Sequence, residues 1–296
     1  MKLFDLHCDT VYKLEKNGLP FENEKTHITF SKTQTYDVYE QVFACWSRNA
    51  STNEENWDAF FRMKQAYEKE ILPHKSESFI PHFAIEGGKL LDGKLERLTE
   101  IKNAGVEMMT LIWKGDCCIG GGHDTNNGLT PFGKEVVKEM IRLGITPDVS
   151  HCSDKTIYDT LLISHDCGGS PVIATHSNSR KVREHTRNLT DEEFSLIKES
   201  CGIVGISLCR EHLDETEKAD IASVIRHIEH YMSLGGEKTV CFGCDLDGIK
   251  SLPDGISGLC ELYKIADELQ KLGYPQKIID GIFYDNAKDF FTKRKI

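Results

Sequence analysis

A histidine and an aspartate stand two residues apart near the start of the chain, in the stretch Asp5-Leu6-His7-Cys8-Asp9. On an extended strand, alternate side chains project from one face, so the Cβ atoms of His7 and Asp9 would lie roughly 6 to 7 Å apart. An imidazole and a carboxylate at this spacing could share one divalent metal ion. A hydrogen-bonded surface pair would show the same spacing, so the metal interpretation depends on further ligands.

Four more residues of suitable type follow apolar segments farther along the chain, namely Glu86, His151, His176 and Asp245. The whole set offers nitrogen and oxygen atoms and no thiolate, which suits zinc or another first-row divalent ion. Five of the six could hold two ions that share one carboxylate, which leaves Asp245 as a proton acceptor and donor. Core packing explains one buried histidine well, but it explains the whole set poorly.

Eight apolar segments are expected to form the strands that position these residues. They lie near residues 3, 42, 80, 106, 145, 171, 202 and 239, and most are separated by helical patterns. Strands that alternate with helices predict parallel pairing, because a parallel strand needs a crossover connection. We therefore predict one domain over residues 1–296, with an α/β fold of the (β/α)8 TIM-barrel type. An open doubly wound sheet is the alternative, but no GxGxxG motif follows the first strand.

A barrel of this type would bring the candidate ligands together. The carboxyl ends of all its strands open onto one face, and this face carries the active site. The predicted ends of strands one, three, five, six and eight carry, in order, His7 and Asp9, Glu86, His151, His176, and Asp245. The sequence therefore predicts a metal site at the C-terminal ends of the strands.

The composition predicts a globular protein that binds neither membranes nor nucleic acids. Of the 296 residues, 39% are hydrophobic and 28% are charged, and the formal net charge is −11. A nucleic-acid surface needs clustered Lys and Arg, and no run approaches the ~20 apolar residues of a membrane helix. Because no signal peptide follows Met1, we expect a cytoplasmic protein in which the 11 cysteines are free thiols.

Seven motifs, in order along nearly the whole chain, carry a resemblance to a known family. They are Asp5-Leu6-His7-Cys8-Asp9, Ile85-Glu86-Gly87-Gly88, Gly128-Leu129-Thr130-Pro131-Phe132-Gly133, Asp148-Val149-Ser150-His151, Thr175-His176-Ser177, Arg187-Asn188-Leu189-Thr190 and Gly243-Cys244-Asp245-Leu246-Asp247-Gly248. In these motifs the chain resembles the membrane (renal) dipeptidase family of zinc metallopeptidases, within the amidohydrolase superfamily.

The resemblance implies a metallo-dipeptidase with two divalent ions, which we expect to be Zn²⁺. It implies that His7 and Asp9 hold one ion, that His151 and His176 hold the other, and that Glu86 bridges the two. A metal-bridging hydroxide would then attack the peptide bond of a free dipeptide.

The resemblance also implies two roles outside the metal ligands. Asp245 would pass the proton to the leaving amine, and Arg187 would bind the terminal carboxylate of the substrate. Asp247 shares a strand face with Asp245, so the choice between them comes from the family.

The chain departs from the animal enzymes of the family at one substrate-contacting position, where Trp113 replaces a histidine. His123 in the nearby glycine-rich loop could substitute for that histidine, but we expect it to be solvent-exposed. We also expect neither a signal peptide nor a lipid-anchor tail.

Two other functions stay open. One is another amide hydrolase of the superfamily, acting on N-acyl amino acids or lactams. The other is a metal-binding barrel without catalysis that serves as an interaction protein. The sequence does not settle the side-chain and D/L preference, the native metal or whether the chain forms a homodimer.

Overall fold

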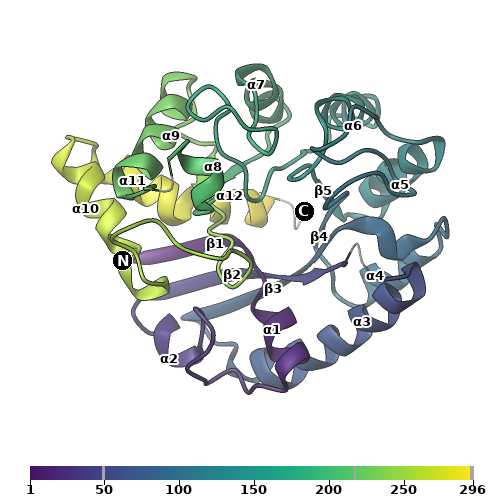
Figure 1. Cartoon of the computed structure of the whole chain (residues 1–296), viewed down its shortest axis with the longest axis horizontal. Helices are drawn as coiled ribbons and strands as arrows, with labels where there is room; N and C mark the ends of the chain where they lie inside the picture. Colours follow the sequence, from purple (N-terminus) through teal and green to yellow (C-terminus); the bar gives the residue numbers. More distant parts are fainter. Residues whose placement is uncertain (49–50, 217, 294–296) are drawn as a thin grey trace.

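Parallel strands form one curled sheet in the computed structural model, with helices around its outer side (Figure 1). The structure describes residues 1–48, 51–216 and 218–293. In this part of the chain the strands are β1 (Lys2–Cys8), β2 (Val38–Trp46), β3 (Phe79–Glu86), β4 (Met108–Thr110), β5 (Thr146–Asp148), β6 (Val204–Ile206) and β7 (Val240–Phe242). Their order is β5-β4-β3-β2-β1-β7-β6.

Seven of the eight predicted strands are therefore present, and the segment near residue 171 differs. It contributes only single parallel bridges, from Ile173 to Asp148 of β5 and from Ala174 to Val204 of β6. The next two backbone N–H groups leave the ladder, because they donate to the side chains of Asp148 and Ser150. The segment thus lies between the two ends of the sheet without forming a named strand.

The helices connect the strands, and most of them cover the outer side of the sheet. They are α1 (Thr10–Asn17), α2 (Phe30–Thr33), α3 (Asn53–Ala66), α4 (Arg97–Asn103), α5 (Pro131–Leu143), α6 (Asp154–Asp166), α7 (Asp191–Glu199), α8 (Arg210–Leu213), α9 (Ile221–Ser233), α10 (Tyr263–Lys271), α11 (Gln276–Asp280) and α12 (Asn286–Lys293). A capping box precedes α7, where the side chains of Thr190 and Glu193 each bond the other residue's backbone. No helix of the described residues is long and apolar enough to cross a membrane.

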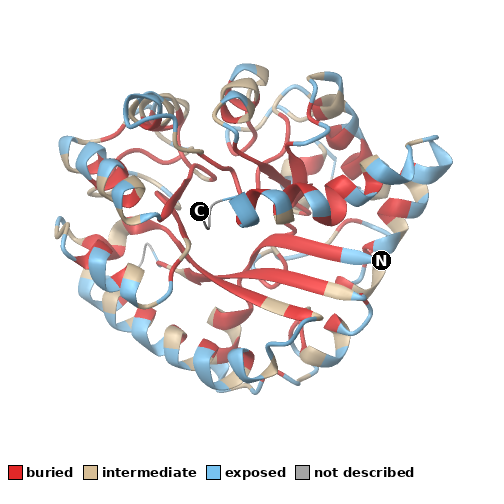
Figure 2. Cartoon of the chain, turned by 180° about the vertical axis from the view of Figure 1, so that it is seen from behind, coloured by how far each residue is buried: buried red, intermediate tan, exposed pale blue. Residues whose placement is uncertain are grey.

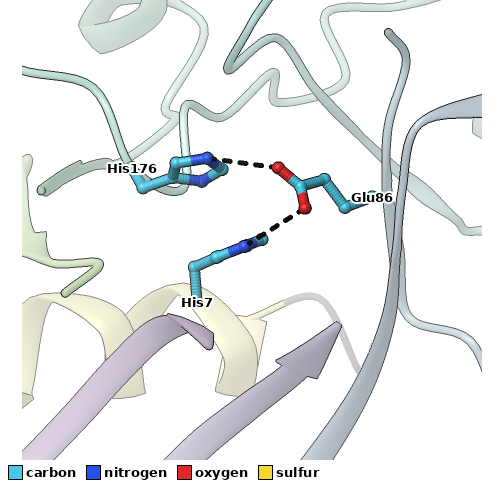
Figure 3. A group of neighbouring side chains, drawn as sticks. All are labelled: His7, Glu86 and His176. Atoms are coloured by element: carbon cyan, nitrogen blue, oxygen red, sulfur yellow. Dashed lines mark ion pairs between the residues drawn. The ribbon is translucent and has the colours of Figure 1, made fainter. Parts of the chain in front are cut away.

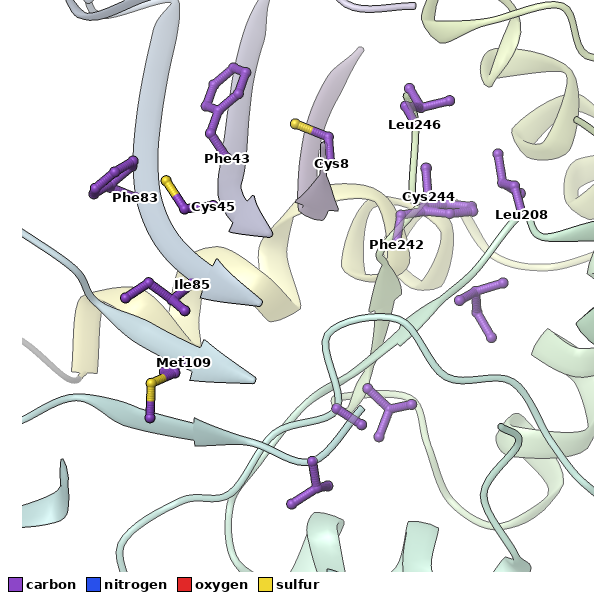
Figure 4. Packing of buried hydrophobic residues seen from close by; sticks show 14 of the residues in the cluster. Cys8, Phe43, Cys45, Phe83, Ile85, Met109, Leu208, Phe242, Cys244 and Leu246 are labelled. Carbon is purple, nitrogen blue, oxygen red and sulfur yellow. The ribbon is translucent and has the colours of Figure 1, made fainter. Parts of the chain in front are cut away.

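Apolar side chains form two buried clusters. The larger cluster lies between the sheet and the outer helices, and Figure 4 shows part of it around Phe43 and Cys45. The smaller cluster joins Phe4 and Leu6 of β1 to Phe290 of α12. Figure 2 shows the strands buried while the helices expose their outer sides. Because α12 packs against residues near the start of β1, the opposite ends of the strands remain available for polar side chains.

A bulge in β1 decides where its histidine points. Asp5 pairs with Gln41 of β2, and Cys8 pairs with Phe43. Between these two pairs β1 has one residue more than β2. An extra residue interrupts the alternation of faces. His7 therefore follows Leu6 toward the inner side of the sheet.

Candidate metal centre

All six predicted strand-end residues converge at the carboxyl ends of the strands. His7 and Glu86 belong to β1 and β3, and the others lie in the segments that follow strands or precede helices. Asp9 differs from its prediction, because it is the N-cap residue of α1 and not part of an extended strand. Its carboxylate still reaches the site, with Oδ2 3.6 Å from Nε2 of His7.

Glu86 lies between His7 on one side and the pair His151 and His176 on the other, and turns one carboxylate oxygen toward each side. Its Oε2 lies 3.7 Å from Nε2 of His7, whereas its Oε1 lies 2.9 Å from Nε2 of His151 and 3.6 Å from Nε2 of His176. Figure 3 shows this arrangement for His7 and His176. The carboxylate therefore has the position of a ligand shared by two neighbouring cation sites.

Two overlapping groups of side chains could each hold one ion. The potential ligand atoms of His7, Glu86 and His176 lie within 4.8 Å of one another, and so do those of His7, Asp9 and Asp245. Asp245, expected only as a proton shuttle, thus also lies within reach of an ion at His7, with Oδ1 3.9 Å from Nε2.

The backbone around these ligands adopts conformations that non-glycine residues seldom take. His151 has φ 69° and Asp245 has φ 61°, both in the left-handed region. Such conformations concentrate at functional sites, where the surrounding structure enforces them. Gly248 has another constraint, because a Cβ there would come within 2.1 Å of Asp9 Oδ2 and 2.4 Å of Asp245 Oδ1.

The electrostatics of the centre favour a cation. Burial alone would lower the pKa of His7, but the charges of Glu86, Asp9 and Asp245 raise it to about 10. Burial raises the pKa of Glu86 well above its ordinary value, and the charge of Asp9 adds to this shift. Burial also raises the pKa of Asp245 to about 7. The negative charge that favours a proton on His7 would equally favour a divalent ion in its place.

The two histidines on the other side of Glu86, His151 and His176, form a neutral pair. Burial lowers the pKa of His151 and of His176 well below the ordinary value, and the charge of Arg187 adds to both shifts. Their Nε2 atoms lie 2.9 Å apart. Neutral imidazoles are the form that binds metal ions.

The residues present therefore fit divalent metal ions. Nε2 of His7 and Oδ1 of Asp9 are buried and have no hydrogen-bond partner among the described residues. A buried polar atom without a partner is costly, and a bound cation would satisfy both atoms. Nitrogen and carboxylate oxygen ligands without thiolate match the preferences of zinc and related ions.

The structure separates the two aspartates that the sequence places on one face. The Asp247 carboxylate accepts hydrogen bonds from Thr10 Oγ1 at 2.7 Å, from the His27 backbone at 2.8 Å and from Lys13 Nζ at 3.2 Å. These hydrogen bonds hold the Asp247 carboxylate against α1 and the segment at His27, whereas Asp245 faces His7.

Arg187 is buried beside the histidines. Its Nη2 donates to the carbonyl oxygen of His176 at 3.2 Å, while Nε and Nη1 are buried without a hydrogen-bond partner in the described part of the chain. Burial lowers the pKa of Arg187, although the charges of Asp245 and Glu86 oppose this shift. The side chain therefore offers free donors and a positive charge at the edge of the metal centre.

A pocket next to the metal centre has one acidic and one aromatic side. Its lining residues are Asp9, Tyr12, Trp46, Glu86, Trp113, His151, Asp245, Asp247 and Gly248. The aromatic rings contact each other edge to face, with centroids 5.0 Å apart for Tyr12 and Trp46 and 4.8 Å for Trp46 and Trp113. We call Tyr12, Trp46 and Trp113 the aromatic wall.

His123 is half-buried at the site, so the expectation of a solvent-exposed histidine is wrong. Its backbone N–H donates to the carbonyl of His151 at 2.7 Å, and Nδ1 lies 3.0 Å from Oγ1 of Thr186. Burial and the charge of Arg187 lower the pKa of His123 to about 4. The hydrogen bond to His151, which is distant in sequence, folds the glycine-rich loop back onto the centre.

Two further buried aspartates support the ligands and were not singled out from the sequence. Oδ1 of Asp5 accepts from the backbone N–H groups of His7 at 3.3 Å and Cys244 at 2.8 Å. In the same way, Oδ1 of Asp148 accepts from the backbone N–H of Ser150, the residue before His151. Each stands two or three residues before a histidine ligand candidate, and this spacing is the sequence signal that could have identified them.

The chain is similar in sequence to known proteins. The family model described as "Membrane dipeptidase (Peptidase family M19)" matches residues 1–292. An uncharacterised protein from the pqqA 5′ region of Klebsiella pneumoniae is 32% identical over 214 residues, which are 68% of this chain and 77% of that protein. Mouse dipeptidase 3 is 30% identical over 217 residues, which are 71% of this chain but only 43% of the mouse protein.

A solved structure has the same fold over almost its whole length. It is a metallopeptidase from Rhodobacter sphaeroides, liganded with a phosphinate mimic of the dipeptide L-Ala-D-Ala. The TM-score is 0.88 at 22% sequence identity, and the match covers 99% of each chain.

Proposed function

The chain belongs to the membrane dipeptidase family, peptidase family M19, and on this premise we propose that it is a metallo-dipeptidase acting on free dipeptides. We further propose that it works with two divalent ions and that these are Zn²⁺. His7 and Asp9 would hold one ion, His151 and His176 would hold the other, and Glu86 would contact both.

One observation carries the proposal. Glu86 directs Oε2 toward His7 and Oε1 toward His151 and His176, so a single carboxylate joins the two halves of the site. Bound divalent ions act as Lewis acids toward a peptide carbonyl and lower the pKa of water, which is the chemistry that amide hydrolysis needs.

Asp245 is the residue that we assign to proton transfer. It lies beside His7 and lines the pocket, and its raised pKa of about 7 suits a group that must both accept and donate a proton near neutral pH. Asp247 is less suited to this role, because its carboxylate already accepts three hydrogen bonds.

The charges around the centre suggest how a dipeptide would lie. Arg187 has free donors for the terminal carboxylate. The pocket on the side of Asp9 and Asp245 is acidic and would receive the positively charged amino group. The side chain of the first residue would then lie against the aromatic wall, which favours aromatic and large apolar side chains over glycine.

The test is turnover of a substrate panel beside measured metal content. We expect hydrolysis of free dipeptides, no hydrolysis of tripeptides, and loss of activity when a strong chelator removes the ions. Hydrolysis of N-acyl amino acids in preference to dipeptides would replace this proposal with a different amide hydrolase.

Some features of the proposal depend on the sequence prediction alone. A cytoplasmic location stays a prediction, and whether the chain forms a homodimer stays open. For the fold, we propose that residues 171–176 occupy the position of the sixth strand, in chain order, of a (β/α)8 barrel, since Ile173 and Ala174 form bridges to β5 and β6.

A further inference from the structure

Asp148 is the centre of a buried hydrogen-bond network beside His151 and His176. Its Oδ1 accepts from the backbone N–H of Ser150 at 3.0 Å and of Thr175 at 2.9 Å. Its Oδ2 accepts from the hydroxyl groups of Thr110 at 2.5 Å and Thr175 at 2.6 Å. The residues after Ser150 and Thr175 are the ligand candidates His151 and His176, so one carboxylate fixes the backbone next to both.

The hydroxyl of Thr175 also contacts the imidazole of His176, with Oγ1 2.8 Å from Nδ1. A hydroxyl group carries one hydrogen, and here that hydrogen is directed to the Asp148 carboxylate. Toward His176 the oxygen can therefore only accept, and Nδ1 must carry the ring hydrogen. The lone pair of the neutral ring is then on Nε2, the atom that faces Glu86 and His151.

We infer that Asp148 and Thr175 are positioning residues that hold His176 in its metal-binding tautomer. The order Asp148–Thr175–His176 is a relay in which the carboxylate orients the hydroxyl and the hydroxyl orients the imidazole. Partners of this kind fix the tautomer and the ring direction of a ligating histidine, and their loss typically reduces metal affinity 10- to 100-fold. This inference rests on the proposed metal centre and is independent of the identity of the substrate.

Thr110 provides a matched control. It donates to the same oxygen of Asp148 as Thr175 does, and both threonines are buried. No hydrogen bond joins Thr110 to a histidine among the described residues. Thr110→Val and Thr175→Val therefore remove the same group from the same carboxylate, but only the second breaks the relay.

The first experiment measures Zn²⁺ binding by competition with a chelator for the wild type, Thr175→Val, Thr175→Ser and Thr110→Val. We expect Thr175→Val to weaken one of two bound ions by about 10- to 100-fold. The serine variant, which keeps the hydroxyl, and Thr110→Val should stay within about threefold of the wild type. Equal effects of the two valine variants would overturn the relay, whereas a wild type that binds no Zn²⁺ would overturn the metal centre instead.

The second experiment reads the wild-type protein without bound metal, so a folding defect of the threonine variants does not affect its result. Nitrogen-15 NMR of histidine in the metal-free wild-type protein distinguishes the two neutral tautomers, and a His176→Gln sample assigns the signal. We expect His176 to carry its hydrogen on Nδ1. A hydrogen on Nε2 would mean that Thr175 donates to the ring and would contradict the inference.

Discussion

Nη2 of Arg187 donates a hydrogen bond to the main-chain carbonyl of His176, 3.2 Å away, so the buried cation is attached to the segment that carries a metal-ligand candidate. This contact fixes the distance between the positive charge and the metal centre. A substrate whose carboxylate bound Arg187 and whose amide carbonyl reached the metals would then need a defined length, which would explain the proposed restriction to dipeptides.

Replacement of Arg187 should distinguish free dipeptides from their amides. Arg187→Ala should lose about 2 to 5 kcal/mol of binding for the free dipeptide, because it removes a buried charge partner. Arg187→Lys should also be impaired, since an ammonium group lacks the planar set of donors. Measured kcat/KM on paired acids and amides checks this, with the more exposed Arg183→Ala as control. Equal losses on acid and amide would remove Arg187 from the carboxylate site.

Glu86→Gln should cost both metal ions. The variant keeps the shape of the side chain but removes the charge between His7 and the pair of His151 and His176. Elemental analysis of the purified protein should fall from close to two ions per chain toward none. Glu40→Gln changes another buried glutamate, on β2 and outside the centre, and should leave the metal content unchanged. A Glu86 variant that retains one ion tightly would show that the carboxylate serves a single metal.

Asp245→Asn should keep metal while turnover falls by roughly 10² to 10⁴, the usual contribution of general acid-base catalysis. The measurement is kcat on a good dipeptide, with metal content determined on the same sample. Asp247→Asn is the comparison, because Asp247 lines the same pocket but its carboxylate already accepts hydrogen bonds from Thr10, Lys13 and the His27 backbone. Near-normal turnover of Asp245→Asn, with a large loss in Asp247→Asn, would exchange the two roles.

Trp113→Ala should change substrate preference more than general activity. The ring lies between Trp46 and His151, with centroids 4.8 Å and 6.2 Å away. An aromatic contact of this kind contributes about 0.5 to 1.5 kcal/mol beyond its buried area, so kcat/KM for Phe-Ala should fall about tenfold. Gly-Ala, which has no side chain for the aromatic wall, provides the control and should change little. Parallel losses on both dipeptides would place the first side chain elsewhere.

His82 should make stability depend on pH. Nε2 lies 3.1 Å from Glu40 Oε2 and Nδ1 lies 2.8 Å from Glu107 Oε1. Tyr284 and Lys288 also bond Glu40. Burial opposes the charged ring, but the hydrogen bonds to Glu107 and Glu40 outweigh it and raise the pKa of His82 above 6.5.

A raised pKa in the folded state means that the folded protein binds the proton more tightly than the unfolded chain does. The resulting stabilisation is complete below the ordinary pKa of 6.5 and disappears as the pH rises through the folded-state value. Urea unfolding gives the free energy of unfolding of the wild type and of His82→Gln at pH 6 and at pH 9. We expect the wild type to exceed the variant by about 1 to 3 kcal/mol more at pH 6 than at pH 9. A difference that is the same at both pH values would mean that His82 is neutral throughout.

The sequence by itself was sufficient for much of the molecule. The alternation of apolar segments and helical patterns predicts parallel strands, and seven of the eight expected strands are present. The site residues could be recognised because ligand chemistry restricts them to a few residue types, and because parallel strands place their carboxyl ends together. The helix start at Thr190 also has a local cause, since a capping box depends only on residues three apart in sequence.

Only the tertiary structure decided how individual side chains point. The bulge between Asp5 and Cys8 brings His7 to the inner side, and it depends on the register with β2, which no local pattern encodes. His123 is half-buried because its loop bonds to His151. Asp245 and Asp247 have the same residue type and strand parity, yet contacts with α1 engage one and leave the other at the metal centre. Local propensity and spacing specify the elements, whereas partners distant in sequence determine which polar atoms meet, because hydrogen bonds and burial depend on the packed chain.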